Sequence, residues 1–223
     1  MLFDLRGRRR RLVQAVYLTL AVLLGGGLVL FGIGGDVSGG LFDAFSDRSG
    51  AGNPNSAIEE RIDRLERRLQ TNPDNQAALQ ELVRNYYQLA TAQQESSGQF
   101  PDDAKDELRR AAASWQRYVA TVEGDPNPAT ATFALRVYDV GALNRPAEAQ
   151  RAAAIIAESE NNVESYLRLV VYATLAGDRR TADLATQKAV ELAPEGQKKD
   201  VERQAEQLKE QSRQQAQQQA PGG

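Results

Sequence analysis

Cysteine and histidine are both absent from the 223 residues of this chain. Without cysteine there is no disulfide, no cysteine nucleophile and no anchor of the acylated-cysteine type. Without histidine there is no Ser-His-Asp triad, and without either residue the common zinc sites and haem attachment motifs are excluded. The sequence therefore predicts no catalytic residue, no bound metal and no cofactor.

Acidic residues are plentiful, and some of them are adjacent, such as Glu59 with Glu60 and Asp102 with Asp103. A pair of carboxylates can catalyse glycoside hydrolysis. These pairs, however, fall at the beginnings of expected helices, where acidic side chains interact favourably with the helix dipole. We therefore expect them to have a structural role, and we do not expect an enzyme.

Positive charge is concentrated at the amino terminus. Of the 27 basic and 30 acidic residues, five arginines (Arg6 and residues 8–11) and two acids (Asp4 and Asp36) precede Val37, which leaves 22 basic and 28 acidic residues in the remainder. An acidic body without a basic stripe argues against nucleic acid as a partner.

Residues 12–35 contain no charged side chain, and residues 12–33 are mostly apolar. At about 1.5 Å per residue, a helix over 12–33 reaches about 33 Å, enough to cross a bilayer core of about 30 Å. The arginines at 8–11 favour a cytoplasmic location for residues 1–11. We therefore expect residues 12–33 to be a single transmembrane helix in the cell membrane, with all later residues extracytoplasmic. The alternatives are a cleaved signal peptide, whose apolar region is usually shorter, and a buried core helix.

Residues 34–55 are rich in glycine, serine, asparagine and aspartate, which is typical of a flexible linker. Leu41, Phe42 and Phe45 interrupt this composition. Three interpretations of these side chains stay open: insertion into the membrane interface, docking on the following domain, and binding of a partner.

From Ser56 onward the apolar residues recur at helical spacing, and no segment alternates as a strand does. Ser56 is the expected cap of a first helix that Pro73 ends, and Asn75 opens the second. Further helices are expected over residues 102–122, 130–142, 147–158, 163–175, 181–192 and 196–215. The predicted fold is all-α and built of short antiparallel helix pairs over residues 56–208. Residues 209–223 are glutamine-rich and are expected to be largely disordered.

Residues 163–196 have the features of a helical repeat. Tyr166, Leu169 and Tyr172 are the large residues of a first helix, Gly177 is suited to a tight turn, and Ala182 and Ala189 stand seven residues apart before Pro194. This segment resembles a tetratricopeptide repeat (TPR), whose period is about 34 residues. Two weaker copies precede it, one containing Leu79 to Tyr87 and one containing Leu143 to Ala149. The resemblance implies a TPR-like α-solenoid following one transmembrane helix.

In the tetratricopeptide repeats that this segment resembles, the first helix of each pair lines a concave groove that binds protein. The groove positions that it implies are Gln80, Arg84, Tyr87, Ala134, Tyr138, Leu167, Arg168 and Val171. The two positions in the second repeat, Ala134 and Tyr138, could shift by one residue. Arg84 and Arg168 could pair with acidic groups of a ligand, or they could simply be solvated.

The layout predicts a scaffold: a membrane-anchored TPR domain that binds partner proteins on the extracytoplasmic face. Proteins of similar layout act beside the bacterial Sec translocon or in envelope assembly, so membrane proteins near the translocon are candidate partners. An oligomerising structural envelope protein without a peptide ligand is the main alternative, and an enzyme is the other.

Overall fold

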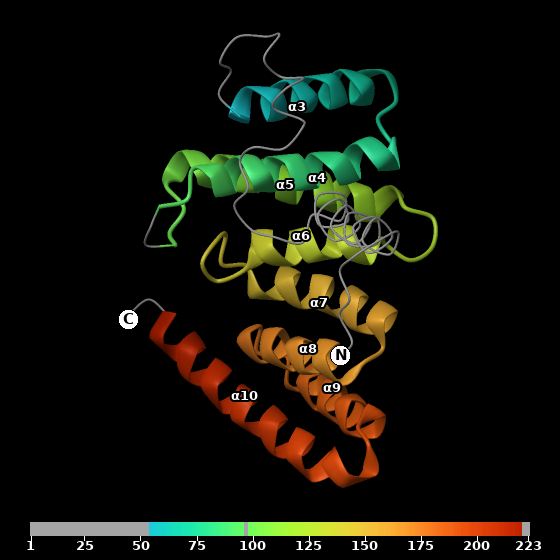
Figure 1. The fold of residues 1–223 in the computed structure, drawn as a ribbon, viewed down its shortest axis with the longest axis vertical. Helices are drawn as coiled ribbons and strands as arrows, with labels where there is room; N and C mark the ends of the chain where they lie inside the picture. The colour runs from blue at the N-terminus through green and yellow to red at the C-terminus, as the bar shows by residue number, and fades with distance from the viewer. Residues whose placement is uncertain (1–53, 96–97, 220–223) are drawn as a thin grey trace, which may run out of the picture. The chain divides into compact units, whose positions relative to one another are not determined.

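The computed structural model describes residues 54–95 and 98–219, and all of its regular elements within these ranges are helices (Figure 1). The predicted all-α class is therefore confirmed for this part of the chain. The helices are α3 (Pro54–Thr71), α4 (Gln76–Ala92), α5 (Asp102–Thr121), α6 (Pro128–Tyr138), α7 (Pro146–Glu160), α8 (Val163–Leu175), α9 (Arg179–Leu192), the short 3-10 helix η1 (Glu195–Gln197) and α10 (Lys198–Gln219).

The helices stack in chain order. Each α-helix packs against the next, α4 also contacts α6, and α10 contacts α8 as well as α9. Figure 1 shows this order from α3 to α10. Because consecutive helices that pack side by side are joined by short loops, neighbours run in opposite directions. The arrangement leaves faces of several helices available to form grooves.

Polar residues begin most of the helices. Asn75 accepts a hydrogen bond from the amide of Ala78 at 3.0 Å, which confirms the expected start of α4. Asn162 and Ser165 form a reciprocal capping box at the start of α8. Such caps supply acceptors for amides that have no partner inside the helix. Ser56, by contrast, is not a cap, because α3 already begins at Pro54.

Helix α6 is shorter than the sequence predicted, since it ends at Tyr138 and not near residue 142. Asp139 leaves the helical conformation, and the amide of Arg145 then donates to the Tyr138 carbonyl at 2.9 Å. Asn144 adopts a positive φ of 50° in this loop. Asparagine tolerates that conformation better than most residues.

Two features of the repeat-like segment are confirmed. Gly177 has a φ of 75° in the turn between α8 and α9, a conformation that favours glycine. Ala182 and Ala189 are buried, and Ala189 belongs to a small cluster in which Leu167 of α8 and Val201 of α10 also lie. These small side chains allow α9 to lie close to its neighbours.

The expectation that residues 209–223 are largely disordered is wrong for residues 209–219, which belong to α10. Lys209 is only 4% exposed and Ser212 is also buried. The ammonium of Lys209 lies 2.7 Å from the Asp183 carboxylate of α9 and 2.9 Å from that of Glu206. Contacts with a preceding helix thus stabilise a segment that has few apolar residues of its own.

The predicted transmembrane segment 12–33 lies outside the described residues, as do most of the linker and its three apolar side chains. Among the helices that the structure does describe, none combines the length and the apolar character needed to cross a bilayer.

Candidate protein-binding grooves

Three predicted groove residues lie together on one face of α4. Gln80, Arg84 and Tyr87 are spaced four and three residues apart, and none of them is buried. The face adjoins α6, where the Thr130 hydroxyl donates to the side-chain oxygen of Gln80 at 3.1 Å. The ring of Tyr87 packs against that of Phe133, with 5.9 Å between the centroids and a tilt of 56°. Gln80, Arg84 and Tyr87 therefore form a row of at least partly exposed side chains on α4.

This row borders a shallow groove of about 340 Å³ between α4 and the first part of α6, called here the α4–α6 groove. It is lined by Ala77, Gln80, Glu81, Arg84, Asn127, Ala129, Thr130 and Phe133. Arg84 is exposed and forms no ion pair with any residue of the described ranges. The groove thus combines the Arg84 guanidinium, the Glu81 carboxylate, amide groups and an aromatic ring.

Three other predicted positions lie in the interior. Ala134 and Tyr138 are each 1% exposed, and the Tyr138 hydroxyl donates to the Ala112 carbonyl at 3.4 Å. Leu167 is 7% exposed and belongs to the cluster shared with α9 and α10. Residues one position apart on a helix point about 100° apart, so Phe133 faces the groove where Ala134 was expected. These three residues are core residues of the fold.

Arg168 and Val171 are partly exposed on α8, but they do not extend the α4–α6 groove. Helices α6 and α8 do not pack against each other, whereas α7 packs against both of them. Arg168 pairs with Glu164 of its own helix at 3.4 Å. The bond between α8 and the end of α6 is made by Tyr172, whose hydroxyl donates to Asp139 at 3.3 Å. Burial, together with this carboxylate, raises the pKa of Tyr172 to about 12.

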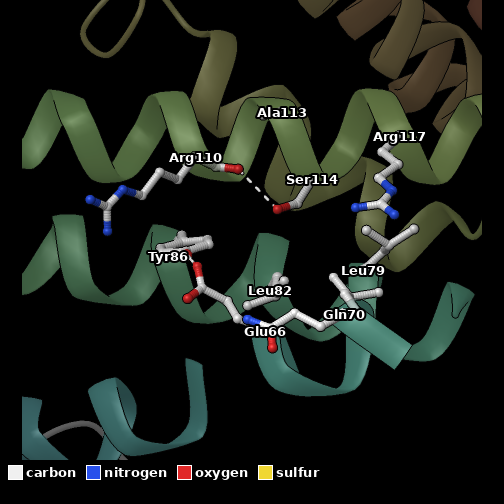
Figure 2. Close-up of a pocket in the computed structure, with 10 residues that line it drawn as sticks. Glu66, Gln70, Leu79, Leu82, Tyr86, Arg110, Ala113, Ser114 and Arg117 are labelled. Carbon is white, nitrogen blue, oxygen red and sulfur yellow. Dashed lines mark hydrogen bonds between the residues drawn. The ribbon is translucent and has the colours of Figure 1, made fainter. Parts of the chain in front are cut away.

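A larger groove, of about 650 Å³, lies between α3 and α5 and was not predicted (Figure 2). It is called here the α3–α5 groove. Its lining residues are Glu66, Leu69 and Gln70 of α3, Leu79, Leu82 and Tyr86 of α4, and Arg110, Ala113, Ser114 and Arg117 of α5. Its one sequence signal is the helical spacing of Arg110, Ala113, Ser114 and Arg117, but finding it requires the placement of three helices.

Tyr86 occupies one end of the α3–α5 groove. Its hydroxyl donates to the Glu66 carboxylate, and the Arg110 guanidinium lies 5.9 Å from the centre of its ring. Burial and the Glu66 carboxylate raise the pKa of Tyr86 well above its ordinary value. Burial also raises the pKa of the neighbouring Glu107, which pairs with Arg110 at 3.7 Å. This end of the groove is therefore occupied by internally paired groups.

Each groove contains arginine, glutamate, hydroxyl, amide and apolar side chains. Within residues 54–95 and 98–219, no group of three or more acidic side chains is placed to hold a metal ion. The arrangement suits recognition of another protein through aromatic and arginine contacts, which dominate binding energy at interfaces. Comparison with protein-family models, with curated proteins and with solved structures gave no match to this chain.

Proposed function

We propose that this chain is a membrane-anchored scaffold whose TPR-like helical domain binds a partner protein on the extracytoplasmic face. The observation that carries the proposal is the open row of Gln80, Arg84 and Tyr87 on α4, which faces Thr130 and Phe133 of α6. These side chains come from successive helix pairs, as the ligand-binding residues of stacked repeats do.

The repeat-like features of the carboxy-terminal half support a TPR-like solenoid. Gly177 takes the positive φ of the expected turn, and Ala182 and Ala189 are buried where α9 meets its neighbours. By comparison with tetratricopeptide repeats, α4 and α6 correspond to the helices that line the ligand-binding groove. The contact between α4 and α6 supports this assignment for the first two pairs, whereas α6 and α8 do not contact each other.

The chemistry of the α4–α6 groove indicates the kind of segment that it binds. Arg84 offers an unmatched positive charge, while the Tyr87 and Phe133 rings offer half-buried apolar surface. Gln80 can bond to a backbone amide or carbonyl. A peptide segment with a carboxylate next to an apolar side chain can pair with Arg84 and cover the two rings, provided that its carboxylate lies away from Glu81, which also lines the groove.

The membrane anchor rests on the sequence. The uncharged segment 12–33 after the arginines at 8–11 favours one span with a cytoplasmic amino terminus. The helical domain is then held near the outer side of the membrane. Proteins of the export machinery or of envelope assembly are the partners within its reach.

Affinity purification of the full chain from crosslinked membranes tests the proposal. We expect export or envelope-assembly proteins to be recovered with the wild type, and to be lost when Arg84→Glu and Phe133→Ala are combined. Arg168→Glu is the control, because Arg168 pairs within its own helix and lies outside the groove. Recovery of other copies of this chain alone would favour the oligomerising alternative.

A further inference from the structure

The attachment of α3 to the rest of the helical domain is narrow. Among the helices that the structure describes, α3 packs against α4 alone, whereas the last helix, α10, packs against both α8 and α9. Ile62 and Leu65 are the only buried side chains among residues 55–71. One polar contact is added to them, since the Tyr86 hydroxyl of α4 donates to the Glu66 carboxylate. The position of α3 therefore depends on a small contact with one neighbour.

The side chain of Asn85 is buried where α4 meets α3. Within the described ranges, α4 packs against α3, α5 and α6. Successive residues turn by about 100° around a helix, so Asn85 points about 180° away from Gln76 and about 160° away from Tyr87. Gln76 donates to the Thr121 carbonyl of α5 at 3.2 Å, and Tyr87 packs on Phe133 of α6. The neighbour on the side of Asn85 is therefore α3.

Asn85 brings an unsatisfied amide into this contact. It is 0% exposed, and neither its side-chain oxygen nor its side-chain nitrogen has a hydrogen-bond partner. Glu107 of α5 has a similar oxygen, Oε2, which is buried and has no partner. These three are all the buried side-chain atoms without a partner in the part of the chain that the structure describes. A polar group that loses its bonds to water on burial, and gains none, opposes the burial.

Like charges also oppose the attachment of α3. Burial raises the pKa of Glu107, and the carboxylates of Glu59 and Glu66 on α3 raise it further. This effect arises because the negative charges of α3 lie near that of Glu107 and repel it. Arg110 lowers the pKa of Glu107 and pairs with it at 3.7 Å, so it offsets part of the repulsion. Release of α3 relieves the rest.

We propose that α3 is a detachable strap, which leaves α4 while the helices from α4 to α10 stay folded. Opening lets the Asn85 amide bond to water and separates the acidic groups of α3 from Glu107. Its main cost is the exposure of Ile62 and Leu65. Local openings of this kind require less free energy than unfolding of the whole domain.

Opening of the strap also changes the length of the connection to the membrane anchor, a consequence that rests on the proposed function. As a helix, the 18 residues of α3 span about 27 Å. As an extended chain they span about 60 Å. Because α3 stands between residues 12–33 and the α4–α6 groove in the chain, the opened strap lets the groove reach further from the membrane without unfolding.

Thiol labelling tests the strap, because the chain contains no cysteine of its own. A single cysteine is introduced as Ala78→Cys, since Ala78 is fully buried and shares the face of Asn85 on α4. Ala205→Cys is the matched control, because Ala205 is equally buried but belongs to α10, which two helices hold. In the full chain in mild detergent, without denaturant, we expect a thiol reagent to label the Ala78→Cys variant faster than the control by about tenfold or more.

Two further variants connect the opening to the unpartnered amide. Asn85→Leu replaces the amide by an apolar side chain of similar shape, and Asn85→Ala removes it without adding volume. Each change should slow the labelling of Ala78→Cys by about fivefold or more, because the closed strap then buries no unsatisfied amide. The labelling of Ala205→Cys should stay within about twofold, since α10 does not pack on α4. Circular dichroism checks that each variant retains the fold.

Three results would overturn the inference. Equal labelling of Ala78→Cys and Ala205→Cys would mean that α3 is held as firmly as α10. An unchanged rate in both Asn85 variants would exclude the unpartnered amide as the cause of the opening. Hydrogen exchange of the unsubstituted chain needs no variant, and equal protection of the α3 and α10 amides would contradict the strap. None of these measurements involves a partner protein or the membrane, so they remain decisive if the proposed function fails.

Discussion

The ammonium of Lys209 lies 2.7 Å from the Asp183 carboxylate and joins α10 to α9, although the side chain of Lys209 is only 5% exposed. A buried lysine is stable in its charged form only when acidic groups are placed beside it. Here Glu206 provides the second such group, at 2.9 Å. Asp183 and Glu206 are themselves exposed, so the pair lies at the edge of the interface.

Removal of this contact should destabilise the fold. We expect Lys209→Ala to lower the free energy of unfolding of the full chain by about 1–3 kcal/mol, since it removes buried hydrocarbon and a partly buried ion pair. Lys188→Ala is the control, because the pair of Lys188 with Glu191 is more exposed and should contribute less than about 0.5 kcal/mol. Chemical denaturation measures both values, and similar losses would show that α10 does not depend on this contact.

Lys209 also shows what the sequence could not predict. Helical periodicity indicated every α-helix that the structure describes, because period and caps are local properties. The row on α4 was implied by the resemblance to a tetratricopeptide repeat. The contact of Lys209 in α10 with a carboxylate of α9 joins residues far apart in the sequence, so no local pattern contains it. The sequence placed Ala134 in the groove, but Phe133 lines it. The prediction was wrong by one residue, which turns a side chain by about 100° around the helix axis.

The buried alanines of α9 give a second prediction. Ala189 is fully buried beside Leu167, so Ala189→Leu should overfill the interface and cost about 1–3 kcal/mol. Ala147→Leu makes the same chemical change at an exposed position in α7 and should have almost no effect. Thermal unfolding followed by circular dichroism compares the two variants. If the two melting temperatures fall equally, the close helix crossing at Ala189 is not present.

Asp178 should make the stability depend on pH in the acidic range. Hydrogen bonds from the amide and hydroxyl of Thr181, and one from Gln150, lower the pKa of Asp178 to about 2. Because the folded-state pKa lies below the ordinary value of about 4, the carboxylate stabilises the fold above pH 4. This contribution is lost as the pH falls from about 4 to about 2.

The variant Asp178→Asn isolates this effect, since asparagine can cap the helix but does not titrate in this range. We expect the wild type to exceed the variant in unfolding free energy near pH 6, and the difference to shrink steadily below pH 4. Urea denaturation at several pH values measures it. A difference that does not change between pH 6 and pH 2 would mean that Asp178 is not held in the hydrogen-bonded, ionised form.

The orientation of the proposed membrane anchor can be tested separately. Protease added to intact spheroplasts should digest the chain beyond about Gly35, because the arginines at 8–11 keep the amino terminus in the cytoplasm. Neutral residues at positions 8–11 should weaken this orientation. Protection of the helical domain in intact spheroplasts, with digestion only after lysis, would contradict an extracytoplasmic location.

Site-specific photo-crosslinking in living cells tests whether a partner protein binds in the α4–α6 groove. A photoreactive amino acid is placed at Arg84 or at Phe133 in the α4–α6 groove, and at the exposed Gln187 of α9 as the control. We expect the two groove positions to form the same crosslinked product with another protein, and the control position not to form it. If neither groove position forms a crosslinked product, or if Gln187 forms the same product equally well, the proposal that this groove binds the partner is contradicted.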